Sequence, residues 1–245
     1  MFQINLSIIL GIVAALASLI GSLIVLTRKK VTDKFLFYFI SIGAGFILAA
    51  TVFDMIPEAL KLSEFAGFYI LGGFFLIHFF EHVFSEHFHF GEETHSDAIN
   101  KKTAWAIMVA FLVHTFLDGV AISSGFSVSA IVGIIIFGAV VLHKIPDGLT
   151  IASVMLASGR TKKGAFAASL ILALATVAGS IWAAAFSQFS SVFLGISAGV
   201  FMHIAATDLI PEVVKKRSIL YSLLLLLGVL MYSVSEILLI KLGIG

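Results

Sequence analysis

Hydrophobic residues fill most of the chain in long runs that short polar connectors separate. Each run is about as long as the roughly 20 residues that a helix needs to cross the hydrocarbon core of a bilayer. The pattern therefore predicts an all-α polytopic membrane protein with eight transmembrane helices, and we treat residues 1–245 as a single transmembrane domain. The run at 128–158 is long for one span and is expected to include a loop residue or two at its start. The predicted spans are 6–27, 35–59, 66–86, 103–124, 128–158, 164–187, 190–213 and 218–242.

Composition supports this interpretation and excludes several classes of protein. Of the 245 residues, 60% are hydrophobic and 12% are charged, whereas a soluble domain carries about 25% charged residues. The net charge is +1 and no basic footprint is present, so no nucleic-acid partner is expected. The chain has no Cys, which rules out disulfides and thiolate metal ligands. The lipid bilayer is thus the expected surrounding of the chain.

Positive residues alternate between the connectors. Counted from the N-terminus, the first, third, fifth and seventh connectors hold or border twelve of the 15 Lys and Arg residues. Because positive residues stay on the cytoplasmic side, we expect both termini outside and a cytoplasmic, histidine-containing loop at 87–102. The predicted location is multi-pass in a cell membrane, either plasma or inner.

Two internal repeats connect distant spans. Residues 44–58 read AGFILAATVFDMIPE and residues 198–212 read AGVFMHIAATDLIPE, with a constant offset of 154. Residues 114–122 read HTFLDGVAI and residues 143–151 read HKIPDGLTI, with an offset of 29. The matched spans run in opposite directions across the bilayer. Such inverted repeats are typical of transporters that bind substrate near the midplane.

The second repeat places two histidine–aspartate pairs inside the membrane. His114 and Asp118 are four residues apart, and the next span repeats the spacing with His143 and Asp147. This spacing puts both side chains on one helix face. Two such faces supply two imidazoles and two carboxylates, which suit Zn²⁺ and also accommodate Fe²⁺, Mn²⁺ or Cd²⁺. The alternative is that each His simply hydrogen bonds an Asp between helices. Pro146, inside the motif, lacks an amide donor and frees the carbonyl of Leu142.

Other polar residues are candidates for a metal pathway or a weak metal site. Spans 2 and 7 carry the pathway candidates Asp54, Glu58, His203, Asp208 and Glu212. For the two glutamates, the alternative is a helix end with an interfacial carboxylate. The loop end of span 3 and its continuation are a candidate for weak, regulatory metal binding, with an amphipathic helix end and a solvated loop as the alternative. Their candidate ligands are His82, His87, His89 and His95.

These features together resemble the ZIP (Zrt/Irt-like protein) metal transporters over nearly the whole chain. The resemblance rests on the eight-span plan, the histidine-bearing loop, the segments HTFLDG and HKIPDG, and the segments DMIPE and TDLIPE. It implies a 3+2+3 helix arrangement and import of zinc, iron or manganese into the cytoplasm. It also implies a primary metal site between helices 4 and 5. The implied ligands are His114, Asp118, His143 and Asp147.

The chain departs from relatives that have a second, bridged metal site. Thr115 and Lys144 stand where those relatives have an asparagine and a carboxylate. Thr176 aligns with their helix-6 glutamate, and Asp54 with the usual helix-2 histidine. A lysine inside a membrane needs a partner, and Asp118 and Asp147 are the nearest candidates. The lysine is expected to occupy the place of a second metal; the alternative is that its flexible stem swings away.

The predicted function is transport of Zn²⁺ or a similar divalent metal, without enzymatic activity. The alternative is an intramembrane metal-dependent hydrolase that uses the same His and Asp residues to activate water. No HExxH motif is present, and every candidate ligand of the site belongs to an inverted repeat. Both observations favour a transporter. The sequence leaves the oligomeric state open, with a homodimer as one candidate.

Overall fold

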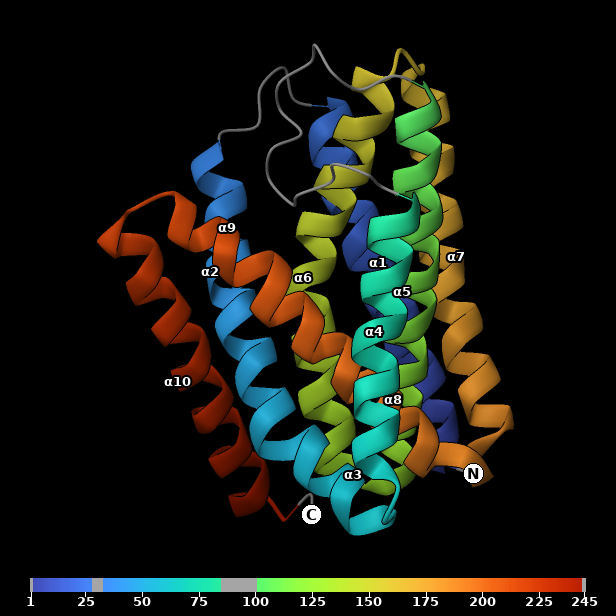
Figure 1. Cartoon of the computed structure of the whole chain (residues 1–245), viewed down its shortest axis with the longest axis vertical. Coiled ribbons are helices and arrows are strands. Elements are labelled where there is room, and N and C mark those ends of the chain that lie inside the picture. Colours follow the sequence, from blue (N-terminus) through green and yellow to red (C-terminus); the bar gives the residue numbers. More distant parts are fainter. Residues whose placement is uncertain (1, 28–32, 85–100, 244–245) are drawn as a thin grey trace.

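The protein is all-helical in the computed structural model, which describes residues 2–27, 33–84 and 101–243 (Figure 1). Two π turns, η1 (Thr51–Met55) and η3 (Ile204–Leu209), and a short 3₁₀ turn, η2 (Ser187–Phe189), join some of the α-helices. The α-helices are α1 (Phe2–Thr27), α2 (Asp33–Ala50), α3 (Ile56–Leu62), α4 (Ala66–Phe84), α5 (Lys101–Val128), α6 (Ala130–Ala157), α7 (Lys162–Ala185), α8 (Ser190–His203), α9 (Ile210–Lys215) and α10 (Ile219–Lys241).

The helices confirm the predicted polytopic membrane fold. The segments α2–η1–α3 and α8–η3–α9 each form one continuous rod, so the eight predicted spans correspond to eight rods in the described part of the chain. Seven of these are long and apolar enough to cross a bilayer, and α4 is apolar over Ala66–Phe80. Ser129 is the loop residue expected near the start of the fifth run, and it caps α6.

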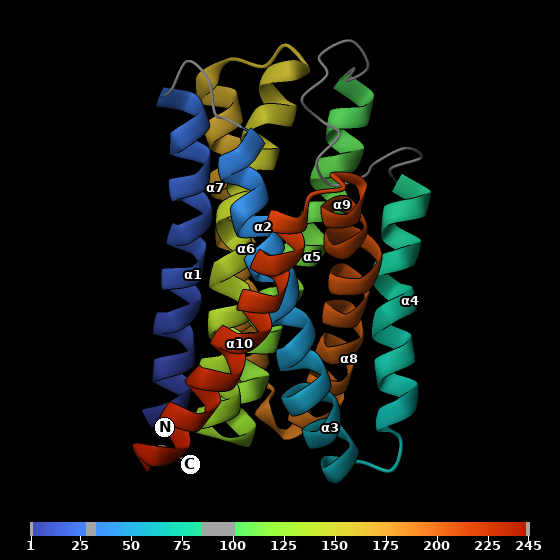
Figure 2. The ribbon, with the colours of Figure 1, turned by 90° about the vertical axis from the view of Figure 1, so that its left-hand side faces the viewer.

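The predicted loop at 87–102 differs from the structure at its end. Lys101 and Lys102 belong to the first turn of α5 instead of to a connector. The remainder of that loop, residues 87–100, lies outside the described residues. Both chain termini lie at the same end of the molecule (Figures 1 and 2), as the prediction of an even number of spans requires.

The described helices pack as two bundles. The first bundle consists of α1, α5, α6 and α7, which all contact one another. The second pairs α2 with α10 and α4 with α8, and it includes the short helices α3 and α9. The bundles meet mainly where α2 contacts α6 and where α5 contacts α8 and α4 (Figure 2).

Reciprocal glycine contacts hold each bundle together. In each of four helix pairs, a Cβ atom added to either glycine would collide with a backbone carbonyl oxygen of the other helix. Such contacts let backbones approach closely, which is how many membrane helices associate. All four helix pairs lie within a bundle. The glycines are Gly21 and Gly148 (α1–α6), Gly119 and Gly179 (α5–α7), Gly45 and Gly228 (α2–α10), and Gly73 and Gly199 (α4–α8).

Adjacent glycines on α4 provide a matched test of this packing. A Cβ atom at Gly73 would meet the carbonyl oxygen of Ile196, whereas a Cβ atom at Gly72 would meet nothing within 4 Å. Gly73→Ala is therefore expected to destabilise the protein by about 1–3 kcal/mol, as overpacking does. Gly72→Ala should leave stability unchanged or slightly higher. The thermal unfolding midpoint in detergent measures both, and equal midpoints would contradict close packing of α4 on α8.

The first sequence repeat has a matching local structure. Each copy contains a π turn in which an amide bonds the carbonyl five residues earlier: Ile56 to Thr51, and Ile210 to Ala205. One residue separates each π turn from a proline, which has no amide proton to donate to a helical hydrogen bond. Each proline is followed by an ion pair three residues apart, Glu58 with Lys61 and Glu212 with Lys215. The inverted repeat therefore extends from the sequence to the backbone geometry.

Candidate metal site

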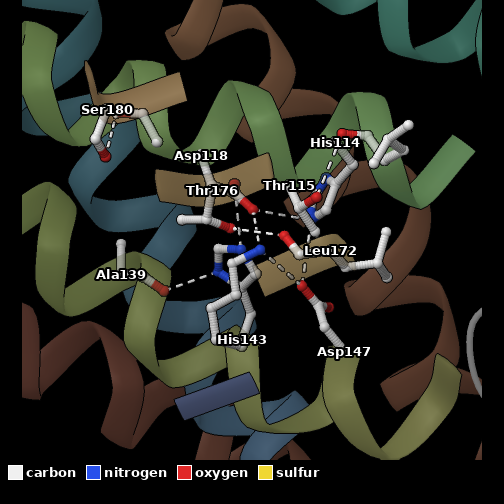
Figure 3. A network of polar contacts seen from close by, with 12 residues as sticks. His114, Thr115, Asp118, Ala139, His143, Asp147, Leu172, Thr176 and Ser180 are labelled. Atoms are coloured by element: carbon white, nitrogen blue, oxygen red, sulfur yellow. Dashed lines mark hydrogen bonds and ion pairs between the residues drawn. The ribbon is translucent and has the colours of Figure 1, made fainter. Parts of the chain in front are cut away.

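Four polar side chains meet between α5 and α6, near the middle of these 28-residue helices. All four are buried, and each offers one ligand atom within 4.8 Å of the others (Figure 3). The i, i+4 spacing places each His above its Asp on one helix face, and the crossing of α5 and α6 brings the two faces together. The four residues are the predicted His114, Asp118, His143 and Asp147.

The distances show that the possible ligand atoms converge. His114 Nε2 lies 3.4 Å from Asp118 Oδ2 and 3.5 Å from Asp147 Oδ2. His143 Nε2 lies 3.4 Å from Asp118 Oδ1. Among the described residues, neither Nε2 atom has a hydrogen-bond partner, and neither has Asp118 Oδ1. The side chains therefore face a common point, with His–Asp separations of 3.4–3.5 Å that are longer than the usual charge-assisted hydrogen bond.

A backbone carbonyl orients one of the two imidazoles. His143 Nδ1 lies 2.8 Å from the carbonyl oxygen of Ala139, to which it donates a hydrogen bond. Nδ1 therefore carries a proton, and Nε2 is the ring nitrogen that faces Asp118. Histidines that bind metals usually donate their other ring N–H in this way. This carbonyl is a functional group that the sequence reasoning missed, and no residue type could have revealed it.

Lys144 points into the same cluster. Its Nζ lies 2.5 Å from Asp118 Oδ2 and 3.4 Å from Asp147 Oδ2, and the side chain is fully buried. The predicted pairing with both carboxylates is therefore present in the structure, and the alternative of a lysine swung out of the pocket is not. An ammonium in this position compensates part of the buried negative charge.

The neighbouring hydroxyls do not extend the cluster. Thr115 donates to the carbonyl of Leu112 at 3.3 Å, and Thr176 donates to that of Leu172 at 3.5 Å (Figure 3). Both hydroxyls are thus satisfied within their own helices. The second bundle contributes an apolar contact. The centroid of the Phe201 ring on α8 lies 6.0 Å from the centroid of the His143 ring. Pro146 lies within α6, which continues unbroken through it.

The structure does not bring the other predicted residues into this group. Glu58 and Glu212 pair with lysines at helix ends, which fits the helix-end alternative. Asp54 is buried in η1, and its Oδ2 has no hydrogen-bond partner within the described ranges. His203 and Asp208 belong to a separate cluster. Of the loop candidates, His82 is in α4 but its side chain is not described, and His87, His89 and His95 lie outside the described residues.

Eight helical rods and a buried set of two histidines and two aspartates define a polytopic membrane protein with a candidate metal site inside it. Comparison with known proteins identifies the family of this membrane protein. The profile of the family described as ZIP Zinc transporter matches residues 93–236. The chain belongs to this family, as the resemblance predicted.

Individual relatives are similar over about half of the chain. It is 32% identical over 120 residues to the zinc transporter ZIP10 of Danio rerio, and 32% over 126 residues to the zinc transporter zipt-7.2 of Caenorhabditis elegans. It is 31% identical over 150 residues to the zinc transporter SLC39A7 of Canis lupus familiaris. The matches cover 47%, 48% and 57% of this chain, but only 14%, 27% and 32% of these relatives. All three are named as transporters, so the hydrolase alternative is not favoured.

Proposed function

We propose that the protein carries Zn²⁺, or a similar divalent transition metal, across a membrane toward the cytoplasm. One observation carries the proposal: four buried ligand atoms lie within 4.8 Å of one another near the middle of two membrane helices. Two imidazoles and two carboxylates form a set that suits tetrahedral Zn²⁺. The family resemblance supports zinc as the cargo and the direction of transport.

The two-bundle architecture supports a mechanism of alternating access. All four ligands belong to the first bundle, and the second presents the Phe201 ring to them. Close glycine contacts join the helices in pairs, and both helices of each pair belong to the same bundle. Across the joint, a Cβ atom at Gly43 would make only ordinary contact with Leu142, at 3.7–3.8 Å. Motion of one bundle against the other would therefore open the site first to one side of the membrane and then to the other, as in other inverted-repeat carriers. We keep Asp54 as a proposed pathway residue because its buried oxygen is available to a passing cation.

Reconstituted vesicles test this function. Purified protein in vesicles loaded with a zinc-sensitive dye should produce uptake of external Zn²⁺ above that of protein-free vesicles. A panel of Zn²⁺, Fe²⁺, Mn²⁺ and Cd²⁺ then defines selectivity. Absence of flux for all four ions in correctly inserted protein would overturn the proposal, and lipid or peptide cleavage without flux would support the hydrolase instead.

We further propose that the site between α5 and α6 holds a single metal ion. Asp118, Asp147 and Lys144 sum to −1 with both carboxylates ionised, and one Zn²⁺ takes the sum to +1. A second Zn²⁺ would take it to +3 in a medium of low dielectric, which is strongly unfavourable. The contacts of Lys144 Nζ with both carboxylates support this, since the ammonium uses the oxygens that a second ion would need.

Lys144→Asp is expected to admit a second metal ion between α5 and α6. The substitution removes a positive charge, vacates the place of the ammonium and adds a carboxylate nearer to the α6 backbone. Anomalous diffraction at the zinc edge locates the ions, with Lys144→Met as a control that removes the charge without adding a ligand. Two ions between α5 and α6 in protein with Lys144 intact would refute the single-metal proposal.

A further inference from the structure

A second histidine cluster lies in the other bundle, between α4 and α8. His78 Nδ1 lies 3.3 Å from His203 Nε2, although the two residues are 125 positions apart. His203 is buried and His78 is half-buried. Phe201, which touches His143, precedes His203 by two residues, and two residues of helix correspond to a rotation of about 200°. The histidine pair therefore lies on the opposite side of α8 from the first cluster.

The surroundings of His203 fix which ring nitrogen faces His78. The Thr207 hydroxyl lies 2.6 Å from the carbonyl oxygen of His203, to which it donates, and 3.0 Å from His203 Nδ1. The hydroxyl also lies 3.1 Å from Asp208 Oδ1, so its single proton goes to a carbonyl or carboxylate oxygen and Nδ1–H donates to the hydroxyl. Asp208 Oδ2, 3.6 Å from Nδ1, favours a proton there as well. His203 Nε2 is thus the ring nitrogen that is directed at His78.

The π turn explains why two orienting groups reach one imidazole. His203 ends α8, and η3 begins at the next residue. In a π turn, hydrogen bonds connect residues five positions apart, so Asp208 lies beside His203 together with Thr207. In a regular α-helix, the fifth residue would have rotated away from that face. A carboxylate or hydroxyl behind an imidazole is the usual outer-shell support of a metal-ligating histidine.

The separation of the two ring nitrogens suits chelation. With Zn–N bonds of about 2.0–2.1 Å, two ligands of a tetrahedral ion are separated by roughly 3.3–3.4 Å. His78 Nδ1 and His203 Nε2 share a hydrogen bond of 3.3 Å, which matches this value, and a bound ion would replace the proton between them. We propose that His78 and His203 form a second, weaker site for a divalent ion that takes imidazole ligands in tetrahedral geometry, such as Zn²⁺. Cu²⁺, which also binds imidazole, serves as the spectroscopic probe. Thr207 and Asp208 orient His203, and water completes the coordination.

An ion in this site would bridge α4 and α8 and so stabilise the second bundle. Two protein ligands hold an ion less tightly than the four ligands of the first cluster. The proposal does not depend on transport, because no residue of the first cluster takes part in it. Absence of metal binding at His78 and His203 would therefore not contradict the proposed transport, and absence of Zn²⁺ flux would not contradict this second site.

Copper binding to the full-length protein tests the proposal. The background variant carries Ala at His114 and His143, and Gln at His82, His87, His89 and His95, which removes the other candidate sites. One Cu²⁺ per chain should bind, and its electron paramagnetic resonance should show coupling to two imidazole nitrogens. His78→Gln and His203→Gln in this background should each abolish the two-nitrogen signal. Asp208→Asn should keep the signal and weaken binding by about 10–100-fold, as loss of an outer-shell partner does.

Two further measurements separate a missing site from a misfolded variant. Cu²⁺ should raise the thermal unfolding midpoint of the background variant but not that of its His203→Gln derivative. Anomalous diffraction of the unmutated protein in Zn²⁺ should place an ion between α4 and α8, whatever the variants do. Absence of copper binding in the folded background, or a two-nitrogen signal that survives both glutamine substitutions, would overturn the proposal.

Discussion

Alanine at any one of the four clustered positions between α5 and α6 is expected to reduce Zn²⁺ flux to near the background of protein-free vesicles. Three ligands and a water hold a metal less well than four protein ligands. Loss of even an outer-shell partner weakens metal binding by about 10–100-fold, so loss of a direct ligand should weaken it at least as much. The variants are His114→Ala, Asp118→Ala, His143→Ala and Asp147→Ala, assayed for initial rate of uptake.

A matched control comes from the same helix. Ser124 is buried on α5, and its hydroxyl donates to the carbonyl of Val120 at 2.6 Å, away from the cluster. Ser124→Ala should therefore retain flux. Each variant must reach the membrane and purify as a single species, since Asp118→Ala also leaves Lys144 with a longer contact to Asp147 as its remaining ion pair in the cluster. Wild-type flux in two or more of the four ligand variants would refute the proposed site.

A disulfide between the two bundles is expected to stop transport reversibly. A Cβ atom at Gly43 on α2 would lie 3.8 Å from Leu142 Cβ on α6, which is about the mean Cβ separation in disulfides. The natural chain has no Cys, so Gly43→Cys/Leu142→Cys introduces the only thiols. If the ion moves by displacement of one bundle against the other, oxidation with diamide should reduce flux to background. A membrane-permeable reductant should restore it.

The two single-cysteine variants are the controls for the disulfide. Oxidation of either single-cysteine variant should leave flux unchanged, which excludes an effect of the thiols or of diamide. Mass spectrometry of the double variant gives the fraction of chains that are crosslinked. Flux that persists in fully crosslinked protein would contradict motion at the α2–α6 joint. The Ala variants of the metal ligands would retain their meaning in that case, because they test the site and not the movement.

Much of the fold follows from the sequence because a bilayer allows few choices. A chain in lipid must satisfy its own backbone hydrogen bonds, so a long apolar run can only become a helix. The runs ending near Thr27 and beginning near Ile219 therefore correspond to α1 and α10 within a few residues. The His-x-x-x-Asp spacing determines which side chains share a helix face. The ligand set of the first cluster was predictable for this reason.

Other features depend on which helices meet, and only the tertiary structure decided them. The contact of Lys144 with Asp118 joins two helices, and so does the packing of Phe201 against His143. The reciprocal glycine contacts join the rods in four pairs, although each glycine taken alone predicts only close packing with some neighbour. His78 and His203 come from segments 125 residues apart, and no periodicity links them. Periodicity determines the face of a helix, whereas the packing of the rods determines what that face contacts.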